Sequence, residues 1–172
     1  MPIKLVVGLG NPDKKYAMTR HNLGYRVIDE LKKHPPHGVR LFKPTGYMNS
    51  SGVSVLDIAQ KSGFRFDEIL VVCDDFSLPL KQRRIRPSGS DGGHNGLASV
   101  LEAFNTLDIP RLRVGIGPVL DGVDPAKFVL QDFSNSEREA VEISIAEAAK
   151  IVHYIVKDGI EKAMNAFNAK VV

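Results

Sequence analysis

The chain has 172 residues, of which 43% are hydrophobic and 25% are charged, and its formal net charge at pH 7 is +3. This length and composition suit one globular domain covering residues 1–172, and the weak positive charge permits an anionic partner without requiring one. Cys73 is the single cysteine, which excludes an internal disulfide and fits a reducing compartment. No signal-peptide pattern and no apolar run of about 18 residues is present, so we expect a cytoplasmic protein without a membrane partner.

The first predicted element is a short strand at Leu5–Val7 that ends in a glycine-rich turn. Asn11 directly follows this turn. The polar segment Thr19–Gly24 comes next, and the amphipathic stretch Leu23–Lys33 predicts a helix. His21 therefore lies at the mouth of a helix, and we expect it near Asn11.

The middle of the chain predicts two strands separated by a helix. The first strand is expected at Val39–Phe42, and the segment Tyr47–Gly52 leads into a helix that closes at Gly63. The continuous apolar run Ile69–Cys73 is typical of a strand that is covered on both faces. We expect this strand to end at Asp74–Asp75.

The last part of the chain opens with a basic run, Lys81–Arg86, which predicts an edge or surface strand. The residues His94–Gly96 open a third helix, and the alternating stretch Arg111–Gly117 predicts another strand. Two further helices are expected at Ser136–Val156 and Ile160–Phe167. Strands that alternate with helices predict a single α/β domain of the phosphorylase/hydrolase-like type, with a mixed, mostly parallel, twisted central sheet flanked by helices.

Asn11 and Asp74 each follow a predicted strand end, and in open α/β sheets ligands bind at the carboxyl ends of the strands. We therefore expect one crevice to contain both. An imidazole can take a proton from water near neutral pH, so His21 is the candidate general base. A carboxylate on its other nitrogen would fix its tautomer, and Asp74 is the candidate for that role. The amides of Asn11, Asn49 and Asn95 can hold a peptide-like ester and its developing oxyanion.

Each of these residues also has a purely structural alternative. His21 could cap a helix or lie on the surface, and Asn11 could simply shape a turn. Asn49 and Asn95 both stand at predicted helix starts, where they could be N-caps. His94 is interpreted as an ordinary residue of the loop before the third helix, without a functional role.

Motifs of other enzyme classes are missing from the sequence. Asp13 stands where a dinucleotide-binding fingerprint needs its third glycine, and there is no phosphate-binding Walker loop. The sequence has no G-x-S-x-G elbow, no H-E-x-x-H motif and no cysteine pair for a metal. These checks leave hydrolysis by an activated water, with no metal and no cofactor, or simple binding.

The ordered motifs VVGLGNP, TRHNLG, KPTGYMNSSG, VVCDD, RPSGSDGGHNGL and RLRVGIG, together with Tyr16, resemble the bacterial-type peptidyl-tRNA hydrolase family over nearly the whole chain. The resemblance implies a monomeric, cytoplasmic, metal-independent α/β enzyme. Its substrate would be peptidyl-tRNA, and cleavage of the ester between peptide and tRNA would recycle tRNA from stalled translation. The segment between Gly24 and Tyr47 is shorter than the family usually has, so we expect part of the sheet edge to be missing.

Residue by residue, the resemblance implies that His21 is the catalytic base and Asp74 its supporting carboxylate. It implies that Asn11 distinguishes blocked from free aminoacyl groups. The resemblance implies that four further residues contact the peptidyl-tRNA end: Tyr16, Tyr47, Asn49 and Asn95. It implies that Met48 lines the channel. It also implies that Arg86 and Arg113 bind tRNA phosphate.

Two other functions stay open at the level of sequence. The chain could be a non-catalytic RNA-binding protein, because the same fold resembles a plant organelle intron-splicing factor. It could also be an esterase acting on a small molecule, although the matches at Arg86 and Arg113 favour a tRNA substrate.

Overall fold

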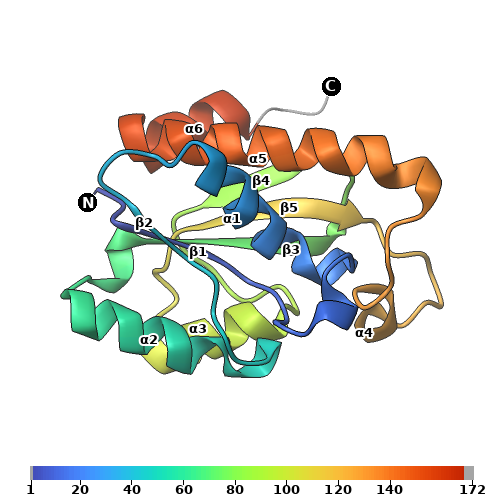
Figure 1. Ribbon diagram of the computed structural model, residues 1–172, viewed down its shortest axis with the longest axis horizontal. Coiled ribbons are helices and arrows are strands. Elements are labelled where there is room, and N and C mark those ends of the chain that lie inside the picture. Colours follow the sequence, from blue (N-terminus) through green and yellow to red (C-terminus); the bar gives the residue numbers. More distant parts are fainter. Residues whose placement is uncertain (1, 169–172) are drawn as a thin grey trace.

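The computed structural model describes residues 2–168 and places a five-stranded sheet at the centre of the molecule, with strand order β2-β1-β3-β5-β4 (Figure 1). The pairs β2–β1, β1–β3 and β3–β5 are parallel, and β4–β5 is antiparallel. The prediction of a mixed, mostly parallel sheet is therefore confirmed. The strands are β1 (Leu5–Gly8), β2 (Arg40–Phe42), β3 (Ile69–Pro79), β4 (Arg83–Arg86) and β5 (Arg111–Gly117).

Helices cover both faces of this sheet. Helices α1, α5 and α6 lie on one face, and α2 and α3 lie on the other (Figure 1). Each face has its own cluster of buried apolar side chains. The helices are α1 (Leu23–Lys33), α2 (Ser51–Ser62), α3 (Asn95–Phe104), α4 (Pro125–Phe128), α5 (Arg138–Asp158) and α6 (Ile160–Phe167). Short 3₁₀ turns include η1 (Lys14–Tyr16), η2 (Arg20–Asn22), η3 (Met48–Ser50), η4 (Phe66–Glu68) and η5 (Asn135–Glu137).

The central strands are apolar on both sides because both sides are covered. Val6, Leu70 and Val72 point into the cluster under α1 and α5. Leu5 and Val71 point into the cluster under α2 and α3. The continuous apolar runs in the sequence are explained by this two-sided burial.

The prediction that the central strand ends at Asp74–Asp75 is wrong. β3 continues to Pro79, because β5 keeps pairing with it at Asp74 and Asp75 before the register shifts. Asp74 therefore lies inside a strand, beyond the point where β1 has ended at Gly8. It is a buried charged residue in the sheet, and it needs hydrogen-bonding partners from outside the sheet.

Two further differences concern the C-terminal half. The helix predicted from Ser136 begins at Arg138, because residues 134–137 form a separately capped turn, η5. The four-residue α4 was not predicted, since so short a helix carries no apolar periodicity. Within residues 2–168, no helix is both long and apolar enough to cross a membrane.

Candidate active site

Close packing between α1 and the strand ends brings His21 to the sheet. A Cβ atom added to Gly24 would lie 2.5 Å from the carbonyl oxygen of Val72 and 2.6 Å from that of Leu9. No side chain fits there, so only glycine lets the helix start this close to β1 and β3. The preceding turn η2 then places the His21 ring beside β3.

Asp74 lies between two histidine rings. His21 Nδ1 is 2.9 Å from Asp74 Oδ2, and His94 Nε2 is 2.9 Å from Asp74 Oδ1. All three residues are buried, with 7%, 3% and 6% of their surfaces exposed for His21, Asp74 and His94. Burial alone would raise the pKa of Asp74, but electrostatic attraction by the His21 and His94 rings and the hydrogen bonds from them lower this pKa well below its usual range. Asp74 is therefore a carboxylate that only accepts hydrogen bonds.

The hydrogen-bond network assigns the ring protons of both histidines. The main-chain N–H of Leu97 donates to His94 Nδ1 at 3.1 Å, so the neutral His94 ring carries its proton on Nε2 and donates it to Asp74. Asp74 also accepts from His21 Nδ1. The remaining nitrogen of His21, Nε2, is then free of a proton and can accept one from water.

Asn11 is held from two sides. Its main-chain N–H donates to Asn22 Oδ1 at 2.8 Å, and Asn22 Nδ2 donates back to the Asn11 carbonyl at 2.9 Å. The main-chain N–H of Met48 donates to Asn11 Oδ1 at 2.9 Å. Because its oxygen is engaged in this way, the Asn11 amide has its Nδ2 group left to donate to a carbonyl or an oxyanion. The simple turn role for Asn11 does not account for these bonds.

Asn49 and Asn95 lie on two elements that pack together. A Cβ atom on Gly96 would be 2.4 Å from Met48 Sδ, so the start of α3 lies directly against η3. Both asparagine side chains are exposed. Neither is the N-cap of its α-helix, because Ser50 precedes α2 and His94 caps α3. The capping alternative for these asparagines is therefore wrong.

The other residues predicted to contact the peptidyl-tRNA end or to line its channel differ in their exposure. Met48 is buried between Asn11 and α3, whereas its neighbour Tyr47 is 61% exposed. Tyr16 is half-buried in η1, where the Lys15 ammonium lies 5.0 Å from the centre of its ring.

Arginines gather on one face of the β4–β5 ladder. Arg84 lies opposite Arg113, and Arg86 lies opposite Arg111, so their side chains share this face. Arg111 is fully buried and donates to main-chain carbonyls of the neighbouring loops. Arg113 donates to the carbonyl of Ser90 at 2.8 Å. Arg84 and Arg86 are exposed. Exposed guanidinium groups on a rigid sheet suit phosphate oxygens.

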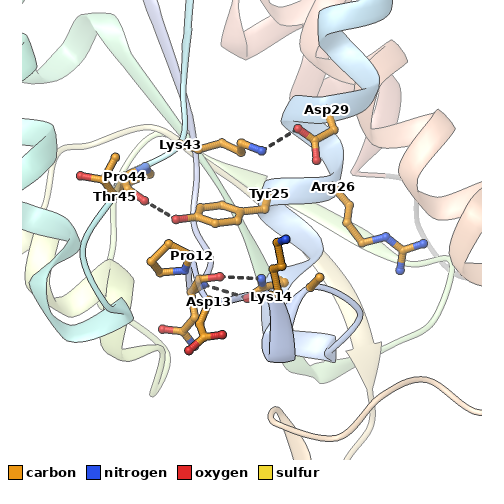
Figure 2. Close-up of a pocket in the computed structure, with 12 residues that line it drawn as sticks. Pro12, Asp13, Lys14, Tyr25, Arg26, Asp29, Lys43, Pro44 and Thr45 are labelled. Carbon is orange, nitrogen blue, oxygen red and sulfur yellow. Dashed lines mark hydrogen bonds and ion pairs between the residues drawn. The ribbon is translucent and has the colours of Figure 1, made fainter.

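A cavity of about 310 Å³ lies beside Asn11 and Asn22, on the side of α1. Figure 2 shows the Tyr25 ring crossing it, with the Tyr25 hydroxyl donating to the carbonyl of Pro44. Lys43 and Asp29 form an ion pair of 2.7 Å at its edge. Burial raises the pKa of Tyr25 to about 12. Asn11 lines this cavity, whereas His21 and Asp74 are not among its lining residues.

His21, Asp74 and His94 also form the donor set in which a metal would be sought, because their ligand atoms lie within 4.8 Å of one another. The two nitrogens that face Asp74 carry protons in the network described above. A divalent cation could bind these three residues only by displacing both protons. The arrangement is thus built for hydrogen bonding through Asp74.

Comparisons with known proteins identify the family of this chain. The family model described as peptidyl-tRNA hydrolase matches residues 5–172. The chain belongs to this family. A peptidyl-tRNA hydrolase from Methylacidiphilum infernorum is 42% identical over 181 residues, covering 96% of this chain and 97% of the relative. One from Thermotoga maritima is 40% identical over 180 residues, with 96% and 97% covered. The crystal structure of peptidyl-tRNA hydrolase from Acinetobacter baumannii superposes with a TM-score of 0.89 at 30% identity, covering 97% of this chain and 95% of the other.

In this member of the peptidyl-tRNA hydrolase family, sequence reasoning missed two residues of the site. The sequence indicates only a loop residue at His94, whereas in the structure His94 caps α3 and bonds Asp74. Its position directly before a predicted helix start was the available signal, since an N-cap side chain must accept a main-chain hydrogen bond. Asn22 gave no such signal, because its partner is the main chain of Asn11.

Proposed function

We propose that this protein hydrolyses the ester between the peptide and the 3′ ribose of tRNA in peptidyl-tRNA, with His21 as the general base. The observation that carries the proposal is the buried, ionised Asp74 on His21 Nδ1, which leaves His21 Nε2 as a proton acceptor. Membership of the peptidyl-tRNA hydrolase family supports the same reaction.

The reaction needs one proton to move twice. As the oxygen of water bonds to the ester carbonyl carbon, His21 Nε2 takes a proton from that water. The bond from this carbon to the ribose oxygen then breaks, and the proton passes from His21 to the ribose oxygen. The products are the free peptide acid and tRNA with a 3′ hydroxyl. General-base assistance of this kind contributes about 10²–10⁴-fold in rate.

Asn11 would hold the acyl end of the substrate. Its oxygen is engaged by Met48 N–H, so its Nδ2 group is available to donate to the carbonyl oxygen as negative charge develops there. The exposed amides of Asn49 and Asn95 would bind the peptide main chain. Tyr16 and Tyr47 would also contact the peptidyl-tRNA end, with Met48 lining the channel between the asparagines.

Arg86 and Arg113 would bind tRNA phosphate. They lie two residues apart along the β4–β5 ladder, on one face of a sheet edge. Such contacts make binding dependent on salt and largely independent of sequence.

We also propose that the protein acts as a monomer in the cytoplasm. Light scattering of the purified protein tests whether it is a monomer.

The alternative of a non-catalytic RNA-binding protein is not favoured, since the matching relatives and structures carry the name of a hydrolase.

Incubation with N-acetylated and free aminoacyl-tRNA distinguishes a hydrolase from a non-catalytic RNA-binding protein. The proposal predicts release from the acetylated form alone, unchanged by a chelator. Release from neither form, with tRNA still bound, would support the binding role.

A further inference from the structure

The main chain of His21 is held by a segment more than 100 residues later in the sequence. The N–H of Arg20 donates to the carbonyl of Gln131 at 2.9 Å, and the N–H of His21 donates to the carbonyl of Val129 at 2.8 Å. Figure 1 shows α4, which leads into this segment, beside the turn that precedes α1. The position of the catalytic ring relative to Asp74 therefore depends on how firmly residues 129–131 are docked.

The Arg20 side chain stabilises the contact between the η2 turn and residues 129–131. Its two terminal nitrogens each donate to one carboxylate oxygen of Glu137, both at 3.0 Å, which is a bidentate pair. The guanidinium carbon lies 4.4 Å from the ring centre of Phe128 and 4.9 Å from that of Phe133. These rings flank residues 129–131 in the sequence, so Arg20 contacts both ends of the segment that binds its own main chain.

Glu137 is itself held in place. Its Oε1 accepts from the main-chain N–H and the hydroxyl of Ser134, both at 2.9 Å, within the capped turn η5 before α5. The Arg20 side chain is 9% exposed and that of Glu137 is 25% exposed, so the pair is shielded from solvent more than an ordinary surface ion pair. A shielded, geometrically fixed pair can set the position of a turn.

We propose that the Arg20–Glu137 pair is a positioning device for catalysis, which docks residues 128–133 on the η2 turn and so holds His21 against Asp74. The proposal rests on the proposed function of His21 as general base. Arg20 and Glu137 act through the main chain of His21, so they are positioning residues. Because small misplacements of a reacting group lower the rate strongly, loss of the pair decreases kcat more than it changes KM.

The chain offers a matched control. Arg26 and Glu142 form a second ion pair between α1 and α5, at 2.8 Å, and the Glu142 side chain is 63% exposed. We expect Glu137→Gln and Arg20→Lys to lower kcat on N-acetyl-aminoacyl-tRNA by roughly 10- to 100-fold, with KM changed by less than about twofold. Glu142→Gln should match the wild type in both parameters. The double variant Arg20→Lys/Glu137→Gln should be no slower than the slower single variant, because both single changes break one contact.

A second measurement does not depend on activity. Hydrogen exchange of the His21 amide, measured by NMR in the substrate-free protein, should be faster in Glu137→Gln than in the wild type and unchanged in Glu142→Gln. Wild-type kcat together with a protected His21 amide in both Arg20→Lys and Glu137→Gln would overturn the proposal. A rise in KM alone, or loss of the whole fold in both variants, would overturn it as well. If the wild type itself releases no peptide, the proposed function fails, while the amide exchange still decides whether the pair holds the turn.

Discussion

At the scale of single residues, the site depends on how Asp74 shares its two oxygens. One oxygen accepts from His21 and the other from His94, and the second histidine is fixed in turn by the Leu97 N–H. This chain of bonds keeps the carboxylate ionised and oriented although it is buried in the sheet. It also determines which nitrogen of His21 is free to act as a base.

His94 therefore has a testable role behind His21, the proposed general base. His94→Ala removes one of the two hydrogen bonds that orient Asp74, so we expect kcat to fall between about 10- and 100-fold with a smaller change in KM. His153→Ala is the control, because His153 is exposed on α5 and bonds the carbonyl of His34. Steady-state kinetics of both variants on N-acetyl-aminoacyl-tRNA measure the difference. Equal kcat values for the two variants would mean that His21 alone suffices to orient Asp74.

At the scale of elements, the contact between α1 and the strand ends brings the base to the carboxylate. Gly24 allows this contact because the nearest main-chain oxygens leave no room for a side chain. The helix itself was predicted at its observed bounds, Leu23–Lys33, since its apolar residues recur at helical spacing. The close approach of its first turn to β1 and β3 is a property of the packing.

Gly24→Ala should destabilise the fold by about 1–3 kcal/mol, as is typical when atoms are forced into a filled site. Gly46→Ala is the matched control, because a Cβ there meets its nearest neighbour, Ser50 Cβ, at an ordinary 3.4 Å. Urea unfolding of both variants and the wild type gives the free energies of unfolding. Equal destabilisation by the two substitutions would contradict the packing account.

The elements that the sequence predicted well are those whose pattern is local. The alternation of Arg111–Gly117 and the helical spacing of Ile160–Phe167 give β5 and α6 at their observed bounds. The end of β3 was wrong because pairing with β5, and not the local pattern, decides where that strand stops. His21 and Asp74 were predicted together, whereas His94 was missed because its role exists only through the distant Asp74.

At the scale of the whole molecule, a charged carboxylate lies inside the sheet between two apolar layers, close to the carboxyl end of β1. The fold tolerates this charge because histidines from both layers reach it, one from the turn before α1 and one from the start of α3. In the proposed mechanism, Asp74 therefore contributes both to catalysis and to stability. The contribution of Asp74 makes the stability of the protein depend on pH.

The pKa of Asp74 is lower in the folded protein than its usual value of 3.8. Its ionised form therefore stabilises the fold above that pH, and the contribution is lost as the pH falls toward the lower folded-state pKa. We expect the difference in free energy of unfolding between the wild type and Asp74→Asn to shrink steadily below about pH 4. Chemical denaturation from pH 7 down to acid measures it. A difference that stays constant across this range would show that the Asp74 charge does not stabilise the fold.

The most direct test of the account is the rate of peptide release by His21→Ala from N-acetyl-aminoacyl-tRNA, measured in single turnover with the enzyme in excess. The account predicts a rate about 10²–10⁴-fold below that of the wild type, with the fold and the affinity for tRNA retained. Release at the wild-type rate by a folded His21→Ala protein would contradict it.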